Sequence, residues 1–184
     1  MAIEQYTESI ALKAMKCTIG KNSFGYVLPQ GDVSGIDKIE KLLKQAGGKP
    51  KECNLEDYSQ GGKGKAKPEY IITFYDDIHI IIVVECKNST KKHCSEKMNK
   101  PNAFAVDGVL YYAKFLKKEY HVIAIAVSGT TTQNMKVDTF YWMRGQNNYT
   151  MLEKAKDIIL EPRNYIELIK GNKLHKAYSL DAIR

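Results

Sequence analysis

Long apolar runs are missing from this chain of 184 residues. A membrane-spanning helix needs roughly 18 or more consecutive apolar residues, and no stretch of the sequence approaches that length. The segment 1–16 has no apolar block of the signal-peptide type and carries two acids, Glu4 and Glu8. We therefore expect a cytoplasmic protein with no membrane partner.

Two common site signatures are also missing. The four cysteines include no C-x-x-C spacing, so a zinc ribbon is not expected, and reduced thiols in a cytosolic protein explain them better. The run GGKGKAK, residues 61–67, lacks the G-x-x-x-x-G-K-[ST] pattern of a P-loop. Neither a structural zinc site nor a P-loop phosphate site is predicted.

The composition is that of one soluble domain with a basic surface. The length suits a single domain with a substantial core, and 43% hydrophobic and 27% charged residues are ordinary values. Lys and Arg number 28 against 21 Asp and Glu, which gives a formal charge of +7. This balance favours a polyanionic partner, although a solvated lysine surface would explain it equally.

Two neighbouring apolar runs form the clearest structural signal. Residues 69–75 and 78–86 are rich in β-branched and aromatic side chains, and Asp76-Asp77 between them indicates a β-hairpin. The second run is almost continuously apolar, which predicts a central strand covered on both faces.

The remaining elements complete an α/β fold. A strand at 78–86, a helix at 103–119 and a strand at 121–127 indicate a right-handed crossover between parallel strands. The expected architecture is a mixed central β-sheet flanked by helices. The other expected elements are helices at 5–16, 35–46 (with Ser34 as N-cap) and 163–170, an edge strand at 137–142, a loop at 20–32, and a mobile loop at 49–68 that could contain one short strand.

Charged residues end the two apolar runs. Side chains alternate along a strand, so Glu85 and Lys87 share one face and Cys86 faces the other way. Glu69 begins the neighbouring strand, where its carboxylate can meet that of Glu85. Two such carboxylates favour a bound cation, and Mg²⁺, for which Mn²⁺ can substitute, suits oxygen ligands. The backbone carbonyl of Cys86 is a third candidate ligand.

An E-x-K triplet can also be a pair of solvated charges at the end of a strand. Three features favour a site instead. Glu85 directly follows the apolar run IIIVV, Glu69 follows a proline at the start of the adjacent strand, and the flanking loops are dense in lysine. In a site, Lys87 would orient or deprotonate a water, or neutralise charge on a phosphodiester, as in metal-assisted hydrolysis.

The paired motifs P-E at 68–69 and E-C-K at 85–87 resemble the bipartite motif of the PD-(D/E)XK nuclease superfamily. Together with the blocks AVDGVLYYAKFL and VIAIAVSG, they resemble the N-terminal nuclease domains of type I and type IIG-like restriction-modification enzymes over residues 33–130. The resemblance implies a restriction-endonuclease-like core of order αβββαβ, about residues 33–145, and Mg²⁺-dependent cleavage of DNA.

The resemblance also assigns roles to individual residues. Glu69 matches the first acid, Glu85 the second and Lys87 the lysine, and Glu69 stands where the family more often has aspartate. The resemblance implies a further acid on the helix before the sheet, for which Glu40 is preferred to Asp37, although a solvated helix charge would explain Glu40 better. Further candidates are Asp107 and Tyr111, which stand at the spacing of a Gln-x-x-x-Tyr motif. They share with Lys114 a polar helix face separate from the buried stripe, and an ordinary amphipathic helix would explain that face equally. Independently of the resemblance, Lys63, Lys65, Lys91 and Lys92 flank the acids and are either DNA-contacting residues or solvated loop lysines.

Helicase and methyltransferase motifs are missing. A restriction-modification system would need them, and a specificity element, in other domains or subunits. We expect residues 1–184 to be a single nuclease domain, and the ending LHKAYSLDAIR favours a fragment of a larger polypeptide. Two alternatives remain: a catalytically weak DNA-binding domain of the same fold, and a non-enzymatic interaction domain.

Overall fold

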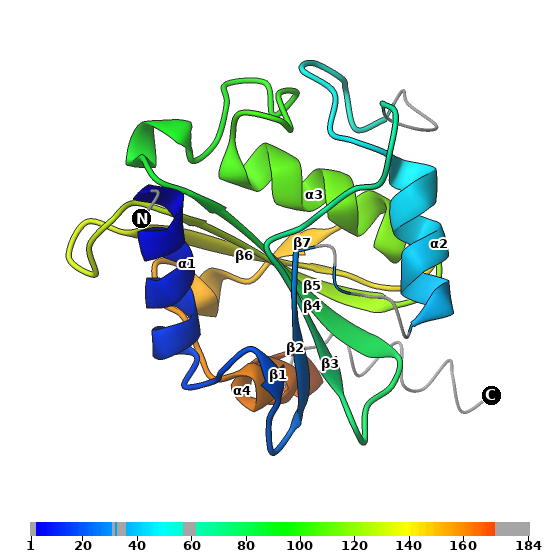
Figure 1. Ribbon diagram of the computed structural model, residues 1–184, viewed down its shortest axis with the longest axis vertical. Coiled ribbons are helices and arrows are strands. Elements are labelled where there is room, and N and C mark those ends of the chain that lie inside the picture. Colours follow the sequence, from blue (N-terminus) through cyan, green and yellow to red (C-terminus); the bar gives the residue numbers. More distant parts are fainter. Residues whose placement is uncertain (1–2, 31, 33–35, 57–61, 172–184) are drawn as a thin grey trace.

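The computed structural model describes residues 3–30, 32, 36–56 and 62–171, and these residues form one mixed sheet with helices on both faces (Figure 1). The strands are β1 (Gly20–Lys21), β2 (Gly25–Pro29), β3 (Tyr70–Phe74), β4 (Ile80–Lys87), β5 (His121–Ser128), β6 (Lys136–Trp142) and β7 (Thr150–Met151). The helices are α1 (Ile3–Ala14), α2 (Asp37–Ala46), α3 (Ala105–Leu116) and α4 (Pro162–Lys170), with short 3₁₀ turns η1 (Thr90–Lys92) and η2 (Glu153–Ala155).

The strands lie side by side in the order of the sequence. Every neighbouring pair is antiparallel except β4 and β5, which run parallel and are joined through α3. The structure therefore confirms three predictions: a mixed sheet, a parallel crossover through a helix, and a central position for the strand at 78–86. The β3–β4 connection is longer than expected, because β3 ends at Phe74 and β4 begins at Ile80.

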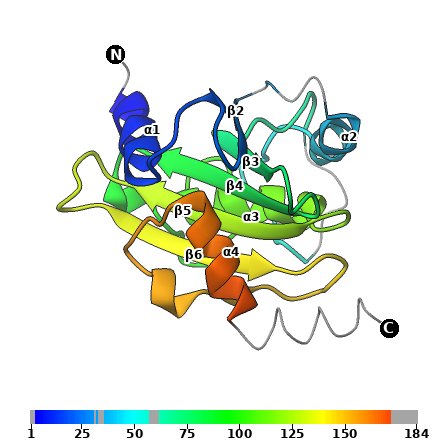
Figure 2. The same ribbon diagram turned by 90° about the horizontal axis from the view of Figure 1, so that it is seen from below.

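Alternation along the strands divides the core into two layers. Ile81 and Val83 of β4 pack with α2 and α3 on one face, whereas Ile82 and Val84 pack with α1 and α4 on the other. Figures 1 and 2 show these two helix pairs on opposite sides of the sheet. Glu85 and Lys87 have the parity of Ile81 and Val83, so they face α2 and α3.

Helix α2 has the expected apolar stripe. Ile39, Leu42, Leu43 and Ala46 are buried, and Gly47 ends the helix with a φ of 67° and an N–H that donates to the Leu43 carbonyl. The proposed N-cap, Ser34, lies outside the described residues, as does the ending LHKAYSLDAIR.

Helix α3 differs from the amphipathic helix that the sequence predicted. Asp107 and Tyr111 were expected on a polar face separate from the buried stripe, but both are buried. The reason is that α2 packs against one side of α3 and the loop 93–101 packs against the other, so both side chains are enclosed. Only Lys114 of the helix is partly exposed.

The segment 20–32 was expected to be a loop, and that expectation is wrong. Residues 25–29 form β2, which pairs with all of β3 and buries Val27. Gly25 permits this pairing, since a Cβ there would lie 1.9 Å from the Thr73 carbonyl oxygen. Turn-forming residues on both sides hid a strand of five residues.

The sheet extends beyond the expected core at 33–145, because β1, β2 and β7 belong to it. Within the described part of 49–68 there is no strand. Among the described residues, no helix is long and apolar enough to cross a membrane.

Candidate active site at the ends of strands β3 and β4

Glu69 directly precedes β3, and Glu85 lies near the end of the adjoining strand β4. The last pair of the β3–β4 register is Tyr70 with Val84, so Glu69 would stand opposite Glu85 if the antiparallel register continued by one residue. Glu85 has the parity of Val83, which packs toward α2 and α3. The charges of Glu85 and Glu69 both act on Tyr112 of α3, so the two acids that the sequence singled out lie near the same side chain.

The Glu85 carboxylate is almost wholly enclosed. Its side chain is 2% exposed, and one of its oxygens, Oε2, forms an ion pair with the Lys49 ammonium. Helix α3 covers the carboxylate with Gly108, where an added Cβ would lie 3.0 Å from Glu85 Oε2 and 2.8 Å from the Pro101 carbonyl oxygen. The glycine leaves the space that this buried acid needs.

Tyr112 of α3 lies beside both acids. Its hydroxyl lies between two acceptors, the Lys67 carbonyl oxygen at 3.2 Å and the Glu85 carboxylate. Burial raises the Tyr112 pKa well above its usual value, and the negative charges of Glu85 and Glu69 raise it further. The tyrosine therefore stays protonated and acts as a fixed hydrogen-bond donor.

Lys87 lies two residues beyond Glu85 on the same face and is partly exposed. Its ammonium donates to the Asn102 carbonyl oxygen at 3.1 Å. Its main chain is anchored, because the Gly129 N–H donates to the Lys87 carbonyl at 3.0 Å. The side chain of Cys86 packs in the layer with α1 and α4, so only its main-chain carbonyl can join the two acids.

These groups form a donor set that suits a hard divalent cation. Within the described ranges, no three His, Cys, Asp or Glu side chains gather as a metal cluster. The carboxylates of Glu69 and Glu85 with one carbonyl would still suit Mg²⁺, which binds through one or two carboxylates and keeps several waters. The Lys49 ammonium already places a positive charge on one of these oxygens.

The accessory acids of α2 make other contacts. Both Glu40 carboxylate oxygens accept from the Lys65 ammonium at 3.2 Å, and the Lys44 ammonium lies 3.8 Å from Oε1. Asp37 is exposed in the first turn of α2. The helix that precedes the first strand is α1, and the charge of its partly buried Glu8 acts on Tyr70, the neighbour of Glu69.

Asp107 and Tyr111 form bonds that hold loops. The Asp107 carboxylate accepts from the Ser95 N–H at 3.1 Å, the Ser95 hydroxyl and the Lys100 N–H at 2.9 Å. The Tyr111 hydroxyl donates to the Ala46 carbonyl at the end of α2, and burial raises its pKa to about 12. These bonds fix the segments before and after the site.

The four candidate DNA-contacting lysines differ in exposure. Lys63 is exposed in the segment that precedes Glu69. Lys91 and Lys92 are exposed in η1, four and five residues beyond Lys87. Lys65 is held by Glu40. His93, which follows Lys92, is buried and bonds to Ser128 and Asp138, both at 2.7 Å.

Sequence reasoning missed Lys49, Gly108 and Tyr112. Lys49 lies in a segment that reads only as a loop, and nothing local signals its contact with a residue 36 positions away. Gly108 and Tyr112 lie in the block AVDGVLYYAKFL. A glycine inside a strongly helical pattern was an available signal of close packing.

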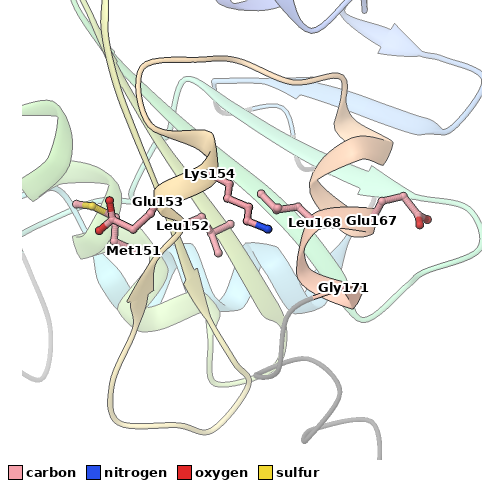
Figure 3. A pocket seen from close by; sticks show the side chains of 7 residues that line it. All are labelled: Met151, Leu152, Glu153, Lys154, Glu167, Leu168 and Gly171. Carbon is pink, nitrogen blue, oxygen red and sulfur yellow. The ribbon is translucent and has the colours of Figure 1, made fainter.

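A separate pocket of about 340 Å³ lies between η2, β7 and α4 (Figure 3). In Figure 3 the Lys154 side chain extends toward α4, whereas Glu167 points away. No candidate catalytic residue contributes to this pocket. Its lining residues are Met151, Leu152, Glu153, Lys154, Glu167, Leu168 and Gly171.

Comparison of the chain with protein-family models, curated protein sequences and solved structures finds no match.

Proposed function

We propose that this chain is a metal-dependent DNA endonuclease domain with a restriction-endonuclease-like fold, belonging to a restriction-modification system. The observation that carries the proposal is the placement of Glu69 just before β3 and of Glu85 near the end of the adjoining β4, both close to Tyr112, with Lys87 on the face of Glu85. The order α1–β1–β2–α2–β3–β4–α3–β5 supports the fold, since it contains the elements of αβββαβ when the two-residue strand β1 and the inserted helix α2 are set aside.

Glu69, Glu85 and the Cys86 carbonyl would hold the metal, with Mg²⁺ or Mn²⁺ as the fitting ions. A bound ion of this kind supplies an activated water and neutralises phosphate charge. Lys87 orients the attacking water or stabilises the developing negative charge on the phosphate. Gly108 and Tyr112 keep the Glu85 carboxylate in place and shield it from bulk water.

The surrounding charge supports a DNA substrate. Lys63, Lys91 and Lys92 are exposed on the two loops that flank the acids, and the chain carries a formal charge of +7. Contacts between these lysines and phosphates would make binding fall steeply with salt concentration. Helicase, methyltransferase and specificity elements would come from other domains or subunits.

The test is cleavage of supercoiled and linear DNA with Mg²⁺, with Mn²⁺ or with EDTA. We expect nicking or cleavage that needs the metal and falls about 100-fold or more in Glu85→Gln and in Lys87→Ala. Matched controls are Glu153→Gln and Lys154→Ala, whose side chains are exposed on η2. Full activity in both site variants would refute the mechanism.

A second candidate is a DNA-binding domain of the same fold that does not cleave. The Lys49–Glu85 ion pair favours it, because a protein ammonium there neutralises a carboxylate without any metal. Salt-sensitive DNA binding with no cleavage under any metal condition would select this candidate. Absence of both binding and cleavage would select an interaction domain.

A further inference from the structure

Lys49 occupies the position where a cation would bind Glu85. Its ammonium pairs with Oε2 of a side chain that is 2% exposed, and the lysine side chain itself is 13% exposed. A lysine this enclosed gives up most of its hydration and its rotamer freedom. The charge of Glu85 compensates for that loss.

The surroundings of Lys49 attract a cation from two further directions. Its ammonium lies 5.1 Å from the centre of the Tyr112 ring, within the range of a cation–π contact. Glu69, whose charge acts on the same tyrosine as that of Glu85, adds a second carboxylate nearby. The site is built around a positive charge, and in this structure Lys49 supplies it.

The segment that carries Lys49 is held at its main chain, so a displacement of Lys49 begins with its side chain. It follows Gly47 and Gly48 and has no regular secondary structure. Two main-chain bonds link Gly48 to the lysine-bearing loop, from Gly48 N–H to the Lys63 carbonyl at 3.3 Å and from Gly62 N–H to the Gly48 carbonyl at 2.9 Å.

We infer that Lys49 is an exchangeable counter-ion, which leaves Glu85 when a divalent metal binds Glu69 and Glu85. A metal ion and an ammonium cannot share Oε2, and their like charges repel at that distance. Metal binding at Oε2 therefore displaces the Lys49 ammonium, whose flexible four-carbon side chain can turn away from the site. This inference rests on the metal site of the proposed function.

The first experiment uses the unmodified protein. The rate at which an amine-reactive ester acylates Lys49 is measured by peptide mass spectrometry, with and without saturating Mg²⁺ or Mn²⁺. Lys51, exposed two residues further along, is the internal reference. We expect the Lys49 rate to rise several-fold with metal while the Lys51 rate is unchanged. An unchanged Lys49 rate, with metal binding confirmed by calorimetry, overturns the inference.

The second experiment compares Mn²⁺ affinity among variants by calorimetry. Lys49→Met removes the competing cation, and we expect binding about tenfold tighter, equal to about 1.4 kcal/mol. Lys49→Arg keeps a cation and is expected to bind as weakly as the unmodified protein, as is the control Lys51→Met. An affinity that is unchanged or weaker in Lys49→Met makes Lys49 a structural partner and overturns the inference.

The outcomes separate this inference from the nuclease proposal. Tighter Mn²⁺ binding in Lys49→Met without any DNA cleavage supports the exchange and refutes the nuclease. Metal-dependent cleavage with an unaltered Mn²⁺ affinity in Lys49→Met refutes the exchange and supports the nuclease. If neither the unmodified protein nor Lys49→Met binds a metal, both the exchange and the nuclease proposal are refuted.

Discussion

Two buried polar clusters lie on the same face of the sheet, and they balance their charges differently. The carboxylate site contains Glu69, Glu85, Lys49 and Tyr112. The histidine network contains His93, Ser128, Asp138 and Lys156. The strand register places the two clusters close together. Lys87 of β4 pairs with Ser128 of β5. Glu85 pairs with Ala126 of β5, and Ala126 pairs with Asp138 of β6.

The histidine network is complete within the protein. His93 Nδ1 accepts from the Ser128 hydroxyl and Nε2–H donates to Asp138, both at 2.7 Å, while the Lys156 ammonium donates to the other Asp138 oxygen at 3.0 Å. Burial lowers the His93 pKa and outweighs the opposing pull of Asp138, so the ring is neutral at pH 7. Each donor has an acceptor, as expected of a structural network.

The carboxylate site instead concentrates two acids against one enclosed ammonium. It depends on a lysine from a segment without regular structure and on the absence of a side chain at Gly108. The difference suggests a division of labour. The histidine network anchors the loop that follows β4, and under the proposed function the carboxylate site would keep its second negative charge for the metal.

The largest effect on stability is expected for Lys49→Met without metal. Removing one partner of an enclosed ion pair leaves Glu85 buried and unpaired, which costs about 3–5 kcal/mol. Urea unfolding in EDTA measures this loss. The double variant Lys49→Met with Glu85→Gln removes the unpaired charge and should recover most of the stability. A loss below about 1 kcal/mol in the single variant would show that Lys49 does not balance the site.

Gly108→Ala ranks second. Helix propensity alone would favour alanine by about 1 kcal/mol, but the new Cβ would meet the Pro101 carbonyl at 2.8 Å and Glu85 at 3.0 Å. Overpacking of this kind costs about 1–3 kcal/mol, so a net loss of stability is expected, together with reduced DNA cleavage. The control is Gly171→Ala, where the nearest atom would be 3.4 Å away. A stabilised, fully active Gly108→Ala variant would contradict the packing argument.

Third is His93→Gln, which is expected to cost about 1–2 kcal/mol because it disrupts two buried hydrogen bonds. The effect should depend on pH. Since folding lowers the His93 pKa from its ordinary 6.5, the unfolded chain binds more protons, and the unmodified protein loses stability as the pH falls below that value.

The pH dependence of stability distinguishes titration of the His93 ring from titration of the groups near it. His93→Gln should lack that loss between pH 7 and 5, whereas the exposed control His79→Gln should retain it. The charges acting on the ring are Asp138, Lys136 and Lys156. Hydrogen bonds from Lys156 and His93 lower the Asp138 pKa despite its burial, so its effect appears only at more acidic pH. Parallel pH profiles for both variants would exclude the assignment to His93.

The parts of this molecule that sequence could predict depend on short-range patterns. Residues 69–75 and 78–86 alternate or run apolar as strands do, and the nearness of Glu69 to Glu85 follows from joining these strands antiparallel. The stripe of α2 follows from helical periodicity. In each case the information lies within about 20 residues, where pleat and pitch fix which side chains share a face.

The parts that sequence could not predict depend on long-range contact. Lys49 reaches Glu85 across 36 positions and His93 reaches Asp138 across 45, and no periodic pattern links them. Strand β2 was missed because its partner β3, rather than its own glycine-rich composition, determines its conformation. Asp107 was expected at a polar surface, but a loop folds over it and supplies its hydrogen bonds.

The smallest effect is expected for Lys156→Met, the counterpart of Lys49→Met in the histidine network. The Lys156 side chain is 50% exposed, and Asp138 keeps its bond to His93 when the lysine is removed. Water replaces the lost ammonium, so we expect a cost of only about 0–1 kcal/mol in urea unfolding, and less at high salt. The contrast between the two lysine-to-methionine variants is the direct measure of the difference between the clusters. Equal losses would mean that Lys49 and Lys156 are equivalent structural partners, and the carboxylate site would then hold no excess charge for a metal.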